Sequence, residues 1–398
     1  MDITITPGKL SGTIQAIPSK SQAHRLLICA AFADRETTLH CPETNQDIEA
    51  TTHCLRMLGA DIQRTAEGYQ ILPAHHIPET ATLDCRESGS TLRFMLPIAG
   101  ALGVDTLFQM SGRLPERPLS PLWEEMERMG CRLSKPTRDT IRCTGKLVAG
   151  VYNIDGGVSS QFITGLLFAT SLLSGDSQIQ IQGTLESAPY VQMTRNAMAL
   201  FGVDTAHFTV RGGQQYLSPG ELTVEGDWSN GAFFLAAKAL GSALEITNLS
   251  PESAQGDKTA AHLLKSLHLM QEISAADIPD LVPILAVAAG ASQGAVFTDI
   301  RRLRLKESDR VESVIRMITA LGGTAKAEDN RLIVSPGTYS GGTVDAQNDH
   351  RIAMAAAIAA TVCTCPVTIL GAECVKKSYP RFWEEYRRLG GNYEQHLR

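Results

Sequence analysis

The chain has 398 residues, of which 43% are hydrophobic and 20% are charged, and its formal net charge is −6 at pH 7. This composition excludes a largely disordered chain, and the length predicts two or three compact domains. The negative charge argues against a nucleic-acid partner, because nucleic-acid-binding proteins usually carry a basic face. No apolar run reaches the roughly 18 to 20 residues that span a bilayer, so no membrane association is expected. The first ten residues lack a signal-peptide profile, and nine cysteines without a CxxC pair indicate reduced thiols in a cytoplasmic protein.

A unit that recurs six times organises the chain. Each copy begins with a small polar cluster and continues into a helix that is apolar nearly all round, and such a helix must be buried. The six predicted buried helices begin near Ser19, Ser88, Ser159, Trp228, Asp277 and Asn348. Serines 19, 88, 159 and 229 follow one another at intervals of 69, 71 and 70 residues. This regularity indicates a structural repeat.

Each buried helix is followed by a short β-type run and then by an amphipathic helix. The predicted strands lie at residues 37–42, 105–111, 177–183, 243–248, 294–300 and 365–370. The amphipathic helices usually end at a glycine that suits a left-handed C-terminal cap, namely Gly59, Gly130, Gly202, Gly322 and Gly390. Residues 61–72 and 324–334 then alternate in polarity, which predicts hairpins.

Six such units favour an α/β fold with two similar domains, each built from three repeated helix and strand units with buried helices and outer sheets, an inverse α/β barrel type. We expect the N-terminal domain to span residues 20–227. The C-terminal domain would combine residues 1–19 with residues 228–398, because the strand DITITPG at the N-terminus can complete the sixth unit.

Positive side chains gather where the predicted helices begin. Lys20, Arg25, Arg93, Arg117, Arg310 and Arg351 lie in or near first turns. A cation at the positive end of a helix is unfavourable by a few tenths to ~1 kcal/mol, and a bound anion would remove this penalty. Taken singly, each cluster also fits ordinary helix capping or a solvated surface charge. Their combination predicts a site for small, strongly anionic molecules.

The motifs that carry these residues resemble one family. Ten motifs follow one another over nearly the whole chain, in the order SKSQAHR, ESGSTLRF, LPERPLSP, SSQFITG, ESAPYV, VEGD, IPDLV, LKESDR, NDHRIAM and KKSYP. This series of motifs resembles the 5-enolpyruvylshikimate-3-phosphate synthase family. The resemblance implies transfer of the enolpyruvyl group of phosphoenolpyruvate to the 5-hydroxyl of shikimate 3-phosphate, with release of phosphate. It also implies two domains of three repeats that close over these two small-molecule substrates.

The resemblance implies roles for individual residues, matched motif by motif. The expected shikimate-3-phosphate set is Lys20, Ser21, Arg25, Ser159, Ser160, Gln161, Ser187, Tyr190, Asp280 and Lys306. The expected phosphoenolpyruvate set is Lys20, Gly89, Arg117, Gln161, Arg310, Arg351 and Lys377, with Arg93 and His350 in support. Among the catalytic residues, Asp280 is assigned to the hydroxyl proton, and Glu307, assisted by Lys20, to the carbon proton. Without the surrounding motifs, Asp280 reads as a helix cap and Glu307 as a partner of the helix dipole.

Three positions depart from the family's pattern. Glu87 stands where an Asn is frequent, Ala188 where many members have Lys, and Arg302 where some have Asn, so their substrate contacts are open. Gly89 is retained, and from this glycine we expect the phosphoenolpyruvate pocket to admit glyphosate as well.

Two other readings compete with this one. The UDP-N-acetylglucosamine enolpyruvyl transferases share the repeats, but they begin their first motif with Lys-Asn and carry a loop Cys, whereas this chain has Lys20-Ser21 and no Cys in residues 111–118. An inactive scaffold that only binds ligands is the second alternative. Neither a metal signature nor a GxxxxGK[ST] loop occurs, so no cofactor is expected, and the molecule is expected to be a monomer.

Overall fold

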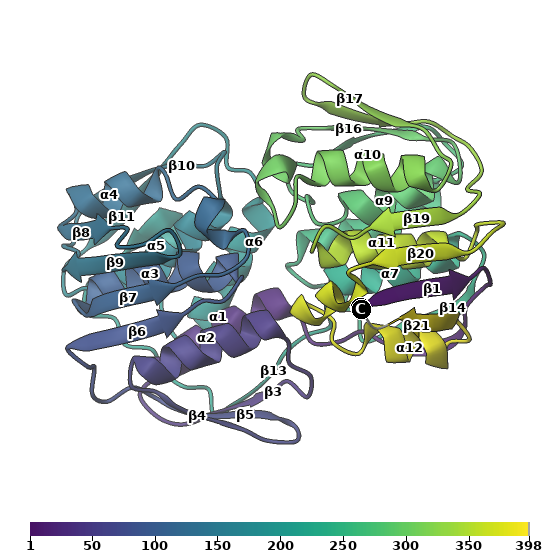
Figure 1. Cartoon of the computed structure of the whole chain (residues 1–398). Coiled ribbons are helices and arrows are strands. Elements are labelled where there is room, and N and C mark those ends of the chain that lie inside the picture. Colours follow the sequence, from purple (N-terminus) through teal and green to yellow (C-terminus); the bar gives the residue numbers. More distant parts are fainter. Residues whose placement is uncertain (397–398) are drawn as a thin grey trace. The chain divides into compact units, whose positions relative to one another are not determined.

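The computed structural model describes residues 1–396, and the chain separates into two compact units. One unit comprises residues 18–224. The other combines residues 1–17 with the chain from residue 225 onward. The observed boundaries fall after residues 17 and 224. The expected boundaries, after residues 19 and 227, lie two and three residues later in the chain. Both units mix helices with sheets (Figure 1).

Residues 18–224 contain six α-helices in the order of the predicted repeats. They are α1 (Lys20–Ala31), α2 (Gln46–Met57), α3 (Gly89–Leu102), α4 (Leu122–Arg128), α5 (Ser160–Ser171) and α6 (Ala188–Leu200). The strands are β3 (Thr37–His40), β4 (Asp61–Arg64), β5 (Gly68–Leu72), β6 (Thr80–Asp84), β7 (Asp105–Gln109), β8 (Cys131–Ser134), β9 (Thr140–Gly145), β10 (Val151–Asp155), β11 (Ser177–Gln182), β12 (Thr209–Val210) and β13 (Glu221–Thr223). They form sheets in the orders β13-β3-β5-β4, β6-β7-β9-β8 and β10-β11-β12.

The second unit repeats this plan. Its helices are α7 (Trp228–Ala239), α8 (Ala260–Leu263), α9 (Val282–Gly290), α10 (Arg310–Ala320), α11 (His350–Ala359) and α12 (Phe382–Arg388). Its strands are β1 (Asp2–Thr6), β2 (Ser11–Gln15), β14 (Ala243–Thr247), β15 (Gln271–Ser274), β16 (Ala295–Thr298), β17 (Ala325–Glu328), β18 (Arg331–Val334), β19 (Gly342–Asp345), β20 (Val367–Leu370) and β21 (Asn392–His396). They form sheets in the orders β19-β20-β1-β21, β15-β16-β18-β17 and β14-β2.

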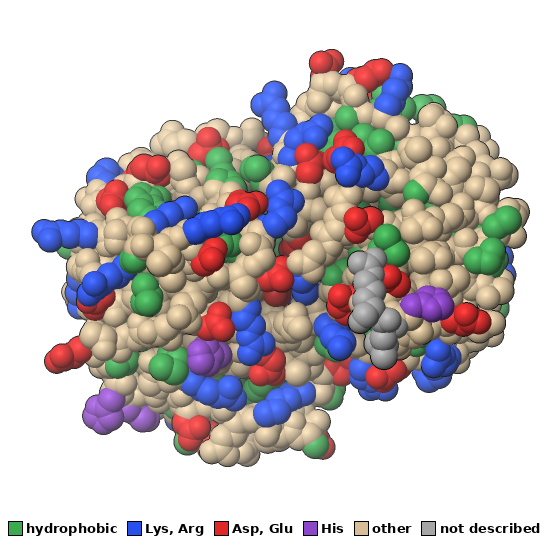
Figure 2. All heavy atoms as spheres, viewed as in Figure 1, with side chains coloured by type: hydrophobic (Ala, Val, Ile, Leu, Met, Phe, Trp, Pro, Cys, Tyr) green, Lys and Arg blue, Asp and Glu red, His purple; other side chains and the backbone are tan. Residues whose placement is uncertain are grey.

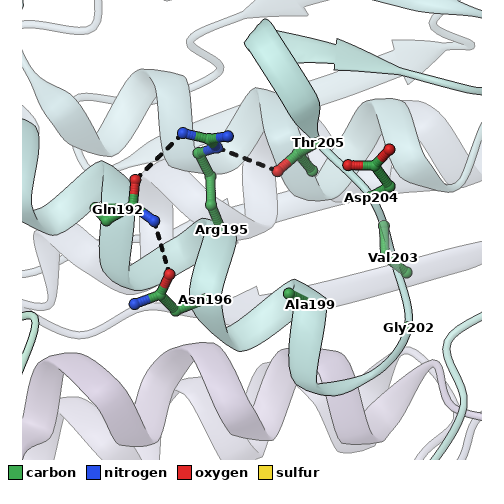
Figure 3. Close-up of a pocket in the computed structure, with 8 residues that line it drawn as sticks. All are labelled: Gln192, Arg195, Asn196, Ala199, Gly202, Val203, Asp204 and Thr205. Carbon is green, nitrogen blue, oxygen red and sulfur yellow. Dashed lines mark hydrogen bonds between the residues drawn. The ribbon is translucent and has the colours of Figure 1, made fainter.

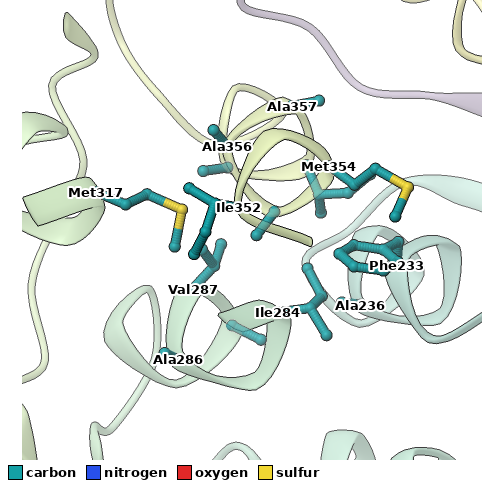
Figure 4. Packing of buried hydrophobic residues seen from close by; sticks show 14 of the residues in the cluster. Phe233, Ala236, Ile284, Ala286, Val287, Met317, Ile352, Met354, Ala356 and Ala357 are labelled. Atoms are coloured by element: carbon teal, nitrogen blue, oxygen red, sulfur yellow. The ribbon is translucent and has the colours of Figure 1, made fainter. Parts of the chain in front are cut away.

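The six apolar helices are buried, as the sequence predicts. Every residue of α9 and of α11 is buried. Figure 4 shows side chains of α7, α9 and α11, among them Phe233, Ile284, Val287 and Ile352, packed into one cluster. The strands on either side of α3, α5, α9 and α11 pair in parallel, as β6 with β7 and β19 with β20 do. A helical crossover is the usual connection between parallel strands, so each of these four helices leads directly to its sheet.

The first strand completes the sixth unit, which confirms the prediction for DITITPG. β1 lies between β20 and β21 and pairs antiparallel with both, and Ile3 and Ile5 are fully buried. β2 pairs with β14. Residues 1–17 therefore belong to the same unit as the C-terminal half of the chain.

The predicted caps and hairpins are confirmed. The five glycines after the amphipathic helices have positive φ, for example 104° at Gly59 and 88° at Gly322. Residues 61–72 form β4 and β5, and residues 324–334 contain β17 and β18. The third and fourth copies are shorter, since β12 has two residues and β15 alone follows α8.

Three of the predicted cationic residues lie before the next α-helix and outside its first turn. Arg117 follows the 3₁₀ helix η1 (Leu114–Glu116), Lys306 follows η5 (Arg301–Leu305), and Lys377 ends η6 (Ala372–Lys377). The next α-helices begin only at residues 122, 310 and 382. Two of these delays coincide with prolines, at 118, 121 and 380, which lack the N–H that a helix interior requires.

The face in Figure 2 carries Lys and Arg side chains interspersed with Asp and Glu side chains, without one large basic area. Among residues 1–396, no helix combines the length and the apolar character that crossing a membrane would demand.

Candidate functional site

Serines cap the three buried helices of residues 18–224. The side-chain oxygens of Ser19, Ser88 and Ser159 accept hydrogen bonds from backbone N–H groups in the first turns of α1, α3 and α5. The capping interpretation of these serines is therefore correct. Ser160, the first residue of α5, is buried as well.

Side-chain hydrogen bonds tie the start of α1 to the start of α3. His24 Nδ1 lies 2.8 Å from Thr51 Oγ1 of α2, and Thr51 Oγ1 lies 2.8 Å from Thr91 Oγ1 of α3. Thr91 donates in turn to the cap oxygen of Ser88 at 2.7 Å. Burial and the nearby cations Lys20 and Arg25 lower the pKa of His24 well below its usual value, so this histidine is neutral.

A second set of bonds continues from α3 through α5 and α6 back to α1. Gln161 Nε2 donates to Ser90 Oγ at 2.8 Å, and Gln161 Oε1 accepts from Arg93 Nη1 at 3.1 Å. One turn further along α5, Thr164 Oγ1 lies 2.8 Å from Thr194 Oγ1 of α6. Arg25 Nε of α1 donates to the same Thr194 oxygen at 2.8 Å. The starts of all three buried helices are thus tied together in this unit.

Arg25 is a buried cation whose hydrogen-bond acceptors are all neutral. Its guanidinium donates to Thr194 Oγ1, to the Ser21 carbonyl at 2.6 Å and to the Tyr190 carbonyl at 2.9 Å, and it lies over the Phe94 ring. Among the described residues it forms no ion pair with a carboxylate. Burial lowers its pKa to about 10, which leaves it protonated at neutral pH. An uncompensated buried charge is costly, and a bound anion would compensate it.

Two further close contacts in this unit involve cationic side chains, one at Lys20 and one at Gly89. Lys20 Nζ lies 2.9 Å from Asp47 Oδ2. At Gly89, the first residue of α3, an added Cβ would lie 2.6 Å from Nη1 of both Arg93 and Arg117. Only glycine lets these two guanidinium groups approach the N-terminus of the helix so closely, and such an end attracts anions.

Ser187 lies at the start of α6, and two of the positions that depart from the family's pattern, Ala188 and Glu87, lie in the same unit. Ser187 precedes α6, is buried and has a left-handed backbone with φ 56°. Ala188 is the first residue of α6, so this position offers no side-chain charge there. The carboxyl group of Glu87 lies against Gly112, in the loop that leads to Arg117.

In the second unit, Arg310 binds three carboxylates at once. Its Nη1 lies 2.6 Å from Asp280 Oδ1, its Nη2 2.6 Å from Glu307 Oε2 and its Nε 2.9 Å from Asp349 Oδ2. Only 1% of the Arg310 side chain is exposed. Although burial alone would lower the pKa of Arg310, Asp349, Glu307 and Asp280 raise it well above its usual value.

Asp280 is surrounded by cations. Arg351 Nη2 lies 2.9 Å from Asp280 Oδ2, and Lys306 Nζ lies 3.7 Å from Asp280 Oδ1. Burial would raise the pKa of Asp280, but Arg351, Lys306 and Arg310 lower it well below its usual value. Burial lowers the pKa of Lys306 to about 8, against the opposing effect of Asp280, and the nearby Arg302 lowers it further.

The structure corrects one expectation about these cations. We expected an anionic ligand to offset the positive charge at the helix starts, yet Arg310, the first residue of α10, and Arg351 of α11 are offset by carboxylates of the protein. Two other predicted residues lie near α11: His350 is its buried first residue, and Lys377 donates to the Asn348 carbonyl at 2.8 Å.

The predicted residues thus form two groups, one in each unit. Residues 18–224 hold Lys20, Ser21, Arg25, Gly89, Arg93, Arg117, Ser159, Ser160, Gln161, Ser187 and Tyr190, and the other unit holds Asp280, Lys306, Glu307, Arg310, His350, Arg351 and Lys377. Reasoning from the sequence missed Asp47, Asp257, Asp349 and Thr194. Asp349 had one available signal, its place as a cap before α11.

Asp257 is a buried carboxyl group beside the second group. It accepts a hydrogen bond from Ser229 of α7. Burial and the negative charge of Asp280 raise its pKa to about 6, and Arg351 acts against this shift.

An open pocket of about 300 Å³ lies along α6 and the residues that follow it, from Gln192 to Thr205. Figure 3 shows Arg195 donating to Gln192 and to Thr205, while Gln192 donates to Asn196. Its lining contains none of the predicted site residues, so the pocket adds nothing to the candidate site.

The chain is similar to known proteins in both sequence and fold. The family model of EPSP synthase (3-phosphoshikimate 1-carboxyvinyltransferase) matches residues 5–275 and 268–386. The chain is 37% identical to a 3-phosphoshikimate 1-carboxyvinyltransferase of Clostridium kluyveri and 37% identical to one of Clostridium acetobutylicum, and each match covers 99% of this chain and 98% of the relative. The fold is that of a solved EPSP synthase of Acinetobacter baumannii, with a TM-score of 0.80 at 22% identity over 99% of this chain and 100% of that one. With a family model spanning nearly the whole sequence and full-length relatives at this identity, the chain belongs to the EPSP synthase (3-phosphoshikimate 1-carboxyvinyltransferase) family.

Proposed function

We propose that the two groups of side chains, one in each unit, carry out the reaction of this family. In that reaction the enolpyruvyl group of phosphoenolpyruvate is transferred to the 5-hydroxyl of shikimate 3-phosphate, and inorganic phosphate is released, a step of the shikimate pathway toward the aromatic amino acids. The substrates together carry two phosphates and two carboxylates. A protein that binds them needs several cations within reach of both molecules.

The observation that carries the proposal is the state of Arg25. It is buried, charged and bonded only to neutral acceptors, so an anion is the partner that its surroundings lack. We assign the anionic groups of shikimate 3-phosphate to Arg25 together with the starts of α1, α5 and α6, where Ser21, Gln161 and Tyr190 lie. The backbone N–H groups and the positive dipole at those helix starts add to the attraction.

Phosphoenolpyruvate is assigned to the cations near α3, α10 and α11. Gly89 leaves room for Arg117 beside the start of α3, while Arg310, Arg351 and Lys377 come from the other unit. The ligand's phosphate and carboxylate would compete with Asp280 and Glu307 for Arg310 and Arg351. When a cation shifts from a carboxylate to a ligand, the pKa of that carboxylate rises.

This competition fits the roles assigned to the two carboxylates. Asp280 is a weak base while Arg351, Lys306 and Arg310 hold its pKa low. Substrate anions that engage these cations would make Asp280 a better acceptor for the proton of the 5-hydroxyl. Glu307, assisted by Lys20, would then deliver a proton to the methylene carbon of phosphoenolpyruvate while the 5-oxygen bonds to the neighbouring carbon, which gives the tetrahedral intermediate. That intermediate would lose phosphate, which takes up the proton held by Asp280, and one proton of the new methyl group would return to Glu307 and restore the enolpyruvyl double bond.

The fold-level expectations belong to the same proposal. We take the two units to be two similar domains of the inverse α/β barrel type, each with three repeats. Three sheets and buried helices in each unit support this assignment. We further propose a cytoplasmic monomer that needs no metal or other cofactor and does not bind nucleic acid.

A phosphate-release assay tests the function directly. The purified chain is offered phosphoenolpyruvate with either shikimate 3-phosphate or UDP-N-acetylglucosamine, and phosphate is measured over time. Release only with shikimate 3-phosphate is expected. Release only with the nucleotide sugar would favour the other enolpyruvyl transferases, and ligand binding without release would favour an inactive scaffold.

A further inference from the structure

We infer that Thr194 is a positioning residue, which sets the direction of the Arg25 guanidinium toward the anionic substrate. Thr194 lies in the second turn of α6, and 0% of its side chain is exposed. It cannot touch a ligand from there, so its effect on binding must pass through the side chains that it holds. The inference rests on the proposed function of Arg25.

The hydrogen bonds of Thr194 hold its hydroxyl oxygen in place between three neighbouring groups. Its oxygen accepts from Arg25 Nε at 2.8 Å, so its own proton is left for the Tyr190 carbonyl at 3.1 Å or for Thr164 Oγ1 at 2.8 Å. The Tyr190 carbonyl also accepts from Arg25 Nη2 at 2.9 Å. Thr194 therefore holds both the guanidinium and the turn of α6 to which that guanidinium is bonded.

Through Thr164, Thr194 also contacts α5, a third helix that carries predicted shikimate-3-phosphate residues. Thr164 is fully buried and lies one turn after Gln161. Because Thr194 contacts α1, α5 and its own helix α6, one hydroxyl aligns three elements that carry predicted shikimate-3-phosphate residues. A planar guanidinium binds a phosphate or carboxylate well only when its fork is correctly oriented. Loss of the Nε contact would let the fork turn and would leave a buried donor without its acceptor.

Kinetics of Thr194→Val test this role, because valine keeps the shape and removes the hydroxyl. The Michaelis constant for shikimate 3-phosphate is expected to rise by about tenfold, as the loss of a buried hydrogen bond to a charged group implies. The turnover number at saturation and the Michaelis constant for phosphoenolpyruvate should change much less. Thr194→Ser keeps the hydroxyl and should restore most of the affinity.

Thr170→Val is the matched control. Thr170 is a fully buried threonine of α5 whose hydroxyl donates only to the backbone carbonyls of Leu166 and Leu167. Its replacement should leave both Michaelis constants unchanged. Equal constants in Thr194→Val and Thr170→Val, or no recovery in Thr194→Ser, would overturn the inference.

Two further arms keep the test decisive. If Thr194→Val does not fold, Thr164→Val removes the neighbouring hydroxyl instead, and a smaller rise in the same Michaelis constant is expected; no rise would count against the inference. The unmodified chain distinguishes the positioning role of Thr194 from the proposed function. A wild-type chain without turnover of shikimate 3-phosphate contradicts the proposed function, whereas an active wild type with an unaffected Thr194→Val contradicts only the positioning role.

Discussion

Arg310 Nη1 lies 2.6 Å from Asp280 Oδ1, so a cation assigned to substrate binding is already paired with a carboxylate assigned to catalysis. The same guanidinium holds Glu307 and Asp349. If an anionic substrate competes with Asp280 for these cations, as we propose, binding of the anion and activation of the base would be linked in this unit.

Replacing either catalytic carboxylate should abolish most of the activity. Asp280→Ala and Glu307→Ala are each expected to lower the turnover number by about two orders of magnitude or more, since a positioned acid or base typically contributes 10²- to 10⁴-fold. Binding of shikimate 3-phosphate, measured by calorimetry, should persist because Arg25 lies in the other unit. Glu312→Ala on the surface of α10 is the control, and an active double variant would rule out both assignments.

The buried ion pairs of Arg310 should contribute strongly to stability. Asp349 is fully buried and accepts from Arg310 Nε and from Ser308, so Asp349→Ala leaves a buried charge with one partner fewer. We expect a loss of about 3 kcal/mol in the free energy of unfolding, as for other broken buried pairs. Breaking the exposed pair of Glu312 with Arg316 should cost less than about 1 kcal/mol. Urea unfolding of the two variants measures the difference, and equal losses would contradict this role of Asp349.

The pH dependence of activity should report Lys306. Its pKa of about 8 means that it loses its charge as the pH rises through 8, and with it the attraction for an anionic substrate. The ratio kcat/KM for shikimate 3-phosphate, measured from pH 6 to 10, should fall on the basic side with an apparent pKa near 8. In Lys306→Arg the fall should move to higher pH, because arginine stays charged. An unchanged basic limb in this variant would exclude Lys306 as its source.

A methyl group at Gly89 should disturb phosphoenolpyruvate selectively. In Gly89→Ala the new Cβ would meet Arg93 and Arg117 at 2.6 Å, and one or both guanidinium groups must move. The Michaelis constant for phosphoenolpyruvate is expected to rise several-fold and inhibition by glyphosate to weaken, with little change for shikimate 3-phosphate. Gly337→Ala, where an added Cβ meets nothing within 4 Å, serves as a control for general effects. Wild-type activity that persists at millimolar glyphosate would contradict the expectation that this compound enters the pocket.

If both units act on the same substrates, the ligands should draw the molecule together. Small-angle scattering is expected to show a smaller radius of gyration when shikimate 3-phosphate and an unreactive phosphoenolpyruvate analogue are added together. The variant Arg25→Ala should not compact at the same ligand concentrations. An identical radius with and without ligands would contradict closure.

The repeats were predictable because buried helices need apolar residues, and runs of such residues recur at regular intervals in the sequence. Helices such as α9 and α11 are apolar on every side, and glycines such as Gly59 stand where a left-handed backbone is needed. The ion pairs were not predictable. Asp349 is 39 residues from Arg310 in the sequence. No local sequence pattern predicts an ion pair between residues this far apart. Thr194 was missed for the same reason, since a threonine inside a helix looks like any other.

The position of β1 between β20 and β21 has a consequence for biosynthesis. β1 can find its two neighbours only after residues 367–396 have been made, so Ile3 and Ile5 cannot be buried in this sheet while the residues between are being translated. Residues 18–224, by contrast, form a continuous stretch that can collapse as soon as it leaves the ribosome. A nascent chain that stalls late would thus carry one folded unit, residues 18–224, between two unfolded segments whose apolar residues are exposed and prone to aggregation.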